Sequence, residues 1–379
     1  NMALAKTVRE YPSTERCIGG ATHFNDAPQW IYDLDNPYLH GVYAPTLDEM
    51  SVSDLAVDGE LPTDLVGGYF RNGPNPVFPP KNRYHPFDGD GMVHGVYFRA
   101  GKAAYRNRYI ETLSRGQERA DGKSISPGVM GPFDYSVSPF GIKDTSNTDV
   151  FWYNGDLMTL WYNAGHPYRL DSQTLETKGY YDLQGRQQRR MSAHSKVDWN
   201  TGELLFFDYG DEPPFMTYGV ADPQGKLLHE VAIDLPGPRL PHDIGFTTHY
   251  AILHDLPFFH DMNVLRQHKY RVLTFHRDIP TRFGIIPRRA PGSDVRWFEC
   301  QPCYILHVTN CWEEGDWVVM DGCRSLNPMP EAQPDEGRAK VAPFPLLGDE
   351  GPAEGAPVAP VVVQRFLELG FDGLEGTPR

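Results

Sequence analysis

The chain has 379 residues, 40% of them apolar, and carries a formal net charge of −15. This acidic balance argues against a nucleic-acid partner, because little would neutralise phosphates, and against electrostatic docking on anionic lipid. A membrane-spanning helix needs about 18 consecutive apolar residues, and no such run occurs; the first twenty residues also lack the apolar stretch of a signal peptide. The length suits two ordinary domains or one large β architecture.

Short strands are the main elements that the sequence predicts. Residues 1–34 are expected to form an irregular arm, and from about residue 50 to 324 runs of β-branched and aromatic residues alternate with turn signals such as Asn154-Gly155. With 37 glycines and 34 prolines, turns must be frequent. Two segments are expected to be helices or loops, Glu111–Gly122 and Asp261–His268. The clearest strands are predicted at Gly95–Arg99, Val150–Tyr153, Leu157–Tyr162, Leu204–Tyr209, Tyr250–His254, Arg271–Phe275 and Trp317–Met320.

The end of the chain changes in character. Residues 327–360 are dominated by Pro, Ala, Gly and Glu, a composition that buries little apolar surface and indicates a linker or disorder. Only Val361–Phe371 regains an apolar pattern. The expected organisation is an arm at 1–34, one β domain at 35–324, and a Pro/Gly/Ala-rich tail at 325–379.

Three histidines share similar settings. His194 follows Met-Ser-Ala, His242 lies in Leu-Pro-His-Asp, and His307 lies in the run Cys303–Glu314. Neutral imidazole is the commonest protein ligand for iron, copper and zinc. Ligands one or more blades apart can converge on the axis of a propeller, whose blades have ~40–50 residues each. The three histidines are therefore candidate ligands of one metal ion.

Three further motifs accompany them in the amino-terminal part, at Gly67–Pro76, Tyr84–His94 and Tyr105–Thr112. Together with the histidine windows, these motifs resemble the carotenoid cleavage oxygenase family, which includes the retinal pigment epithelium isomerase and bacterial stilbene-cleaving oxygenases. The resemblance extends from about Asp35 to about Arg324.

The resemblance implies a fold, a cofactor and a reaction. The fold would be a seven-bladed β-propeller, complete or incomplete, with a loop or helical cap over an axial iron site held by His194, His242 and His307. The reaction would be oxidative cleavage of a carbon–carbon double bond in a small apolar alkene, a carotenoid or apocarotenoid. It would use Fe(II) and O₂, give two carbonyl products and need no protein acid or base. Peripheral membrane contact during substrate uptake and the oligomeric state stay open.

Three residues near the expected site depart from the family pattern or bear on the substrate. Tyr162 occupies the position of a family glutamate that accepts a hydrogen bond from a ligand imidazole, a role that a phenol oxygen fills more weakly. Trp161 occupies the position of a lysine in the stilbene-cleaving relatives. Upstream, the stretch around Phe133 has no match to their substrate-binding tyrosine. We therefore expect an apolar tunnel wall suited to a polyene, although Trp161 could equally be ordinary core.

The carboxyl-terminal end departs from the family pattern too. Family members hold iron with a fourth histidine near the carboxyl terminus, and this sequence has no histidine after His307. We expect either a truncated form or a differently built end, with weak iron binding and association through open sheet edges. The alternatives kept are stilbene or phenylpropenoid cleavage, an isomerohydrolase reaction, an inactive truncated propeller, and a protein-interaction propeller.

The five cysteines are irregularly spaced, which fits a reducing compartment and predicts a cytoplasmic protein. Zinc binding by Cys300, Cys303, Cys311 and Cys323 is the alternative to buried core thiols. The spacing of the second pair favours core thiols.

Overall fold

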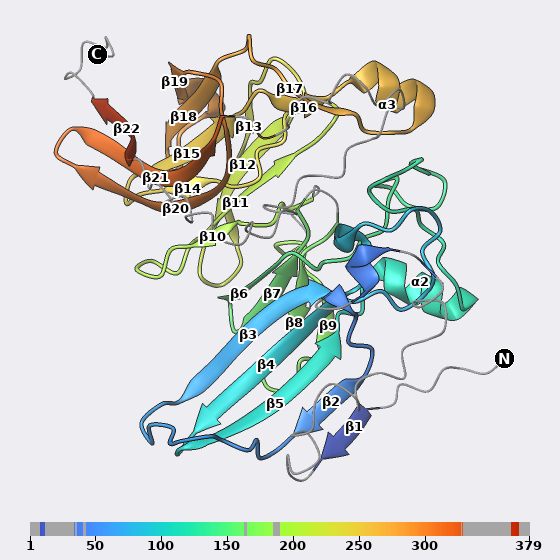
Figure 1. The fold of residues 1–379 in the computed structure, drawn as a ribbon. Helices are drawn as coiled ribbons and strands as arrows, with labels where there is room; N and C mark the ends of the chain where they lie inside the picture. The colour runs from blue at the N-terminus through green and yellow to red at the C-terminus, as the bar shows by residue number, and fades with distance from the viewer. Residues whose placement is uncertain are drawn as a thin grey trace, which may run out of the picture.

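The computed structural model describes residues 8–11, 36–40, 43–162, 165–184, 190–326 and 365–370, together with residues 34 and 328. The predicted arm and the Pro-rich part of the predicted tail lie almost entirely outside these residues. Where the chain is described, it consists of sheets with few and short helices (Figure 1), and all strand pairs except the parallel pair of Val8–Tyr11 with Glu49–Val52 are antiparallel; this confirms the predicted all-β class. The domain boundaries at 34 and 325 remain predictions.

Five sheets of three or more strands follow one another along the described chain. In sheet order, the first contains β1 (Val8–Tyr11), β2 (Glu49–Val52), β5 (Lys102–Tyr109), β4 (Gly91–Arg99) and β3 (Gly67–Pro74). The second contains β6 (Asp149–Tyr153), β7 (Asp156–Leu160), β8 (Tyr168–Leu170) and β9 (Thr177–Tyr180). The third contains β10 (Lys196–Val197), β11 (Leu204–Tyr209), β12 (Met216–Ala221) and β13 (Leu227–Ile233).

The last two sheets continue the series. The fourth contains β14 (Gly245–Phe246), β15 (Tyr250–Asp255), β18 (Thr281–Pro287) and β19 (Arg296–Cys300). The fifth contains β20 (Tyr304–Glu314), β21 (Trp317–Ser325) and β22 (Arg365–Gly370). A separate ribbon of β16 (Phe258–His260) and β17 (Leu273–Phe275) is inserted between β15 and β18. Strand β17 is shorter than the strand predicted at 271–275.

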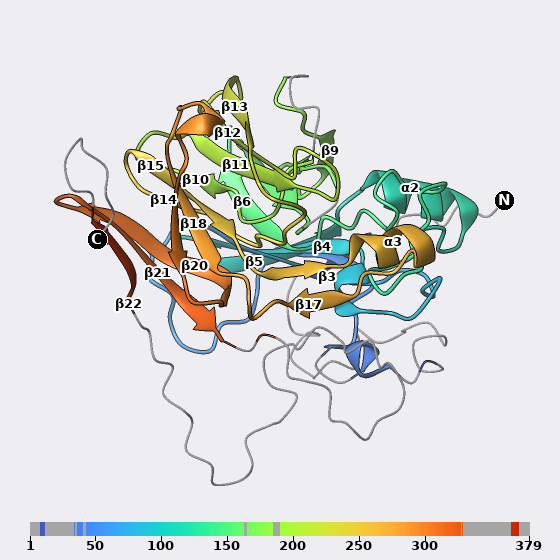
Figure 2. The same cartoon turned by 90° about the horizontal axis from the view of Figure 1, so that it is seen from above.

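Local sequence explains the connections. Asn154 and Gly155 join β6 to β7 with φ angles of 49° and 81°, the left-handed backbone that a two-residue hairpin turn requires. Helix α2 (Leu113–Asp121) begins where the Thr112 side chain accepts the Arg115 N–H, and α3 (Met262–His268) begins where Asp261 caps two N–H groups. Both segments expected to be helices or loops are therefore helical. Figures 1 and 2 agree that α2 and α3 lie on the same side of the sheets.

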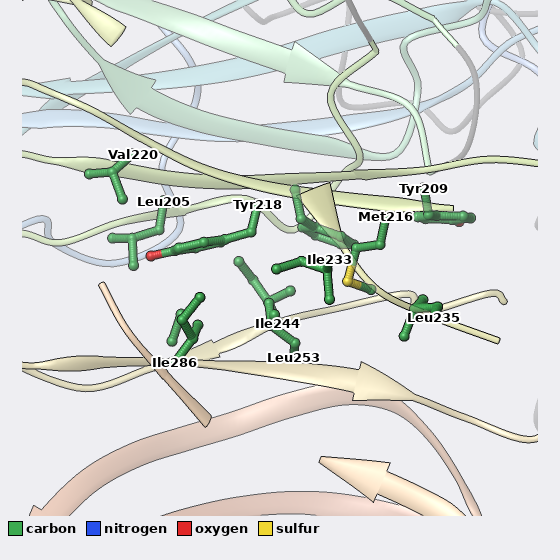
Figure 3. Close-up of a cluster of buried hydrophobic side chains, with 12 residues drawn as sticks. Leu205, Tyr209, Met216, Tyr218, Val220, Ile233, Leu235, Ile244, Leu253 and Ile286 are labelled. Carbon is green, nitrogen blue, oxygen red and sulfur yellow. The ribbon is translucent and has the colours of Figure 1, made fainter. Parts of the chain in front are cut away.

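The middle sheets are buried on both faces. All six residues of β11 are buried, and alternation along the strand sends Leu205 and Phe207 toward the fourth sheet and Leu204 and Phe206 toward the second. Figure 3 shows the cluster between the third and fourth sheets, in which Leu205 and Tyr218 face Ile244, Leu253 and Ile286.

Equivalent clusters join the other neighbouring sheets. Val93 and Ile110 meet Leu157 and Leu170 between the first and second sheets, and Ile252 meets Val318 between the fourth and fifth. Each sheet thus packs against its neighbours in the chain, as the blades of a propeller do.

A substitution at Gly219 tests the packing of β12 against Phe206 of β11. It lies opposite Phe206 in the β11–β12 register, and a Cβ there would overlap the buried Phe206 ring. We expect Gly219→Ala to lower the free energy of unfolding by about 1–3 kcal/mol because of overpacking. At the partly buried Gly116 of α2, a Cβ would meet no atom within 4 Å, so Gly116→Ala should raise stability by about 0.5–1 kcal/mol. Urea unfolding followed by circular dichroism measures both; equal effects would contradict the packing described.

Candidate metal centre

Three imidazoles from three successive sheets converge. His194 lies just before β10, His242 just before β14, and His307 within β20, so each belongs to the first strand region of its sheet. The ring centroids are 4.7, 4.8 and 5.1 Å apart, and the candidate ligand nitrogens lie within 4.8 Å of one another. Among the described residues, this is the group of His, Cys, Asp and Glu side chains that could hold a metal ion.

The spacing of the His194 and His242 nitrogens fits a first-row metal. The Nε2 atoms of His194 and His242 are 3.1 Å apart. Two nitrogens bound at about 2.1 Å and at right angles on one metal ion would lie about 3.0 Å apart. A donor set of imidazoles alone suits iron, copper, zinc or nickel better than calcium or magnesium, which prefer oxygen ligands. The residues present therefore fit a transition metal.

Burial keeps two of these imidazoles neutral. The pKa of His242 lies well below the usual 6.5, first because the ring is buried and then because His194 and His307 are close. The pKa of His307 is also lowered, first by the partial desolvation of its ring and then by His194, although the residue as a whole is exposed. Neutral imidazole is the form that binds metal, so His242 and His307 are in the ligating state at neutral pH.

Asp149 positions His194. Its Oδ2 accepts the backbone N–H of His194 at 3.0 Å and lies 3.3 Å from the ring Nδ1, while the His194 backbone has a φ of 65°. Burial would raise the pKa of Asp149, but the hydrogen bonds from His194 outweigh it and hold the pKa below its usual value. A proton kept on Nδ1 leaves Nε2 with a free lone pair directed toward the other histidines.

Asp243 connects all three histidine segments. Its Oδ1 lies 2.7 Å from the Lys196 ammonium, two residues after His194, and its Oδ2 accepts the Val308 N–H at 2.8 Å, one residue after His307. Asp243 itself follows His242 and is 1% exposed. One buried carboxylate thus fixes the relative positions of three strands from three sheets.

Neither aspartate was singled out from the sequence. Asp149 directly precedes an apolar strand, and Asp243 directly follows a candidate ligand. The position of Asp243 next to His242 could have indicated its role. The role of Asp149 could not be found in this way, because its contact with His194 joins residues from different sheets.

The structure brings the three predicted tunnel residues together. Trp161 and Phe133 are buried in one cluster with Leu265 of α3, and Tyr162 packs against it. The Tyr162 ring lies 6.4 Å from the His242 ring, centroid to centroid, and 5.1 Å from Trp161. The Trp161 indole N–H has no hydrogen-bond partner among the described residues. This apolar cluster, Phe133, Trp161, Tyr162 and Leu265, therefore adjoins the histidines.

A cleft of about 690 Å³ adjoins the apolar cluster. Phe140 and Leu265 belong to both the cleft and the cluster, and Tyr135 and Arg190 add polar groups to the cleft wall. Arg190 also donates to the Tyr209 carbonyl, and the Tyr209 hydroxyl donates to the Tyr162 carbonyl at 2.8 Å. The cleft is thus linked through Tyr209 and Tyr162 to the neighbourhood of His242.

The cysteines do not join the histidines. Cys303 is buried, Cys300 and Cys311 are partly buried, and Cys323 is exposed, so the expectation of a core thiol is wrong for Cys323. All four are free thiols. No helix in the described part of the chain is both long and apolar enough to cross a membrane.

Comparison with known proteins finds a family model and several similar enzymes. Residues 43–351 match the family model of the retinal pigment epithelial membrane protein. The chain is 35% identical over 322 residues to carotenoid 9,10(9',10')-cleavage dioxygenase 1 of Phaseolus vulgaris, covering 79% of this chain and 59% of the relative. It is 32% identical over 293 residues to the isoeugenol monooxygenase of Pseudomonas nitroreducens, covering 76% and 61%.

A solved structure of a similar enzyme also matches this chain. The lignostilbene dioxygenase of Pseudomonas brassicacearum matches with a TM-score of 0.70 and 32% identity, over 76% of this chain and 61% of that one. The likeness confirms the predicted propeller class. The chain spans about three-fifths of the length of these relatives. By the extent of the family match and the shared fold, the chain belongs to the carotenoid cleavage oxygenase family.

Proposed function

We propose that this chain provides the iron site of a non-heme Fe(II) dioxygenase that cleaves a carbon–carbon double bond of a carotenoid or apocarotenoid, giving two carbonyl products. The observation that carries the proposal is the convergence of His194, His242 and His307 from three successive sheets. The bean relative, named a carotenoid cleavage dioxygenase, supports it.

Each part of the site has a distinct role in this proposal. His194, His242 and His307 present unprotonated nitrogens to the metal, and Asp149 and Asp243 hold these ligands in place. Bound iron would supply the activation of O₂ beside the alkene. No acid or base from the protein is needed.

The apolar cluster would orient the substrate. Phe133, Trp161 and Tyr162 pack in one cluster with Phe140 and Leu265 of the cleft wall, and Tyr162 lies near His242, so these side chains would exclude water from the space next to the metal. Their apolar character favours a polyene. The substrate would be a small apolar alkene, and O₂ would be the second reactant. The protein would be cytoplasmic and would contact membranes only peripherally, during substrate uptake.

A second candidate is cleavage of a stilbene or phenylpropenoid double bond. The similarity to an isoeugenol monooxygenase and a lignostilbene dioxygenase favours it, and Tyr135 and Arg190 offer hydrogen-bonding groups for a phenol at the cleft. Trp161 in place of the relatives' lysine argues against it.

The reaction is tested with the iron-loaded chain, an apocarotenoid and ¹⁸O₂. Two carbonyl products carrying label are expected. Isomerised or hydrated product without label would point to an isomerohydrolase, and no turnover by a fully loaded chain would point to an inactive propeller.

Removal of one ligand should abolish stoichiometric metal binding. We expect His242→Ala and His307→Ala each to lose bound iron, because two imidazoles hold the ion far more weakly than three. His307 is exposed, so its variant tests the ligand role without opening a cavity in the core. The exposed His249 pairs with Glu313 away from the site, and His249→Ala should bind iron as the wild type does. Metal analysis after gel filtration decides; retention of iron by both ligand variants would refute the site.

The role of Asp243 can be measured separately. Asp243→Asn keeps the shape and one acceptor for Val308 but weakens the contact with Lys196, so the histidine segments lose part of their support. We expect metal affinity to fall about 10–100-fold, as for other groups that orient ligands. Asp316→Asn, in the exposed β20–β21 turn, should leave affinity unchanged. Titration with Co(II), followed by its visible absorption, reports affinity and ligand geometry; an unchanged spectrum and affinity would contradict the role.

Substrate preference tests the apolar wall. In a competition between an apocarotenoid and a 4-hydroxystilbene, we expect the apocarotenoid to be cleaved preferentially, because Trp161 offers no cation to a phenolate. Trp161→Lys should shift the ratio of kcat/KM values toward the stilbene. A wild-type preference for the hydroxystilbene would favour the second candidate function.

A further inference from the structure

Two cysteines outside the metal centre form a dithiol. Cys300 is the last residue of β19, Cys303 directly precedes β20, and Gln301 and Pro302 make the bend between them. The two thiols are close enough to shift each other's pKa, and the Cys300 thiol also donates to the Gln301 carbonyl at 3.4 Å. A Cys-x-x-Cys turn with facing thiols is the arrangement from which a short-loop disulfide closes with little backbone movement.

Neighbouring groups hold this turn in place. The hydroxyl of Thr281, a fully buried residue of β18, accepts the Cys303 N–H at 2.9 Å and donates to the Cys303 carbonyl at 2.8 Å. Thr281 is also the register partner of Cys300. The same residue therefore fixes both cysteines against one strand.

The local charge favours a thiolate. The interaction with Cys300 lowers the pKa of Cys303 to about 7, against the opposing effect of burial, and Thr281 and Arg324 contribute in the same direction. The same interaction raises the pKa of Cys300, so the thiolate of the pair is on Cys303 and Cys300 keeps its proton. Cys300 is partly exposed, whereas Cys303 is buried. A small oxidant in solution thus meets Cys300 first, with Cys303 behind it as the partner thiolate.

A metal is the weaker explanation of the pair. Within the described residues, the only group of three or more potential ligands that lie together is the histidine site, so the two thiols have no third ligand. Structural zinc in proteins takes four.

We propose that Cys300 and Cys303 are a site of reversible oxidation, which a low-molecular-weight disulfide such as oxidised glutathione converts to an intramolecular disulfide. Cys300 sulfur attacks the glutathione disulfide as its proton passes to the Cys303 thiolate, and one glutathione thiolate leaves. That thiolate takes the proton from Cys303, whose sulfur then attacks Cys300 Sγ and expels the second glutathione thiolate. The dithiol loses two electrons, and the oxidant becomes two molecules of reduced glutathione.

The disulfide would affect the β20–β21 hairpin, which carries the candidate ligand His307. His307 lies four residues after Cys303 on β20, so the disulfide would close a covalent ring at the base of the strand that carries this histidine. The inference itself stands on the thiols and does not depend on the proposed oxygenase activity.

The test is a redox titration of the whole chain. The protein is equilibrated in glutathione buffers of increasing oxidised fraction, quenched with acid, alkylated and digested for mass spectrometry. We expect one transition in which the peptide holding Cys300 and Cys303 loses two hydrogens and becomes resistant to alkylation, independently of protein concentration. Dithiothreitol should reverse it.

Variants assign the bond. Cys300→Ser and Cys303→Ser should both lose the transition, whereas the matched control Cys323→Ser, at the exposed thiol, should keep it at the same midpoint. The proposal is overturned if both thiols of the wild type stay alkylatable in the most oxidising buffer. It is also overturned if they form only separate glutathione adducts, or if the bond joins another cysteine. The wild-type titration decides even where a variant fails to fold.

Discussion

The sheets of this protein cannot exist singly, because the middle ones carry apolar residues on both faces. β11 shows this most clearly, with Phe206 packed toward one neighbouring sheet and Phe207 toward the other. At about 25 cal/mol per Å² of apolar surface removed from water, a four-stranded sheet with two exposed apolar faces would be strongly unfavourable. Each sheet must therefore stack between its neighbours, and this stacking brings the starts of the third, fourth and fifth sheets together.

The convergence of the three histidines is a consequence of that stacking, and buried charge fixes it further. An isolated aspartate with 1% exposure would be costly to ionise, but Asp243 has an ammonium from Lys196 and N–H donors from its surroundings. These partners come from three sheets, so the favourable electrostatics exist only when the sheets are correctly packed. The requirement to satisfy one carboxylate therefore also sets the positions of the three histidine segments.

Sequence alone predicted the parts of this arrangement that depend on local patterns. The Asn154-Gly155 turn, the two helical segments and the strand character follow from residue type and periodicity, and the histidines stood out through their similar settings. The contacts of Asp149 with His194 and of Lys196 with Asp243 join residues about 45 positions apart, across sheets, and no local pattern encodes them. Burial is equally non-local: Cys323 lies on an apolar strand, and its exposure depends on which elements cover β21.

The distribution of charge around the histidines distinguishes this chain from the pattern that its family suggests. Tyr162, where the family pattern has a glutamate, packs its ring near His242. The Asp149 carboxylate contacts His194, and the Asp243 carboxylate contacts the Val308 N–H and Lys196. A carboxylate therefore contacts the His194 ring directly, and a second carboxylate joins the strands, whereas His242 has a tyrosine ring beside it. Because groups outside the ligand set orient the ligands of a metal, Asp149 would act on the site through a charged contact and Tyr162 through ring packing. The Tyr162 ring also continues the apolar cluster of Trp161 and Phe133 up to His242, so packing and charge approach the three histidines from different residues.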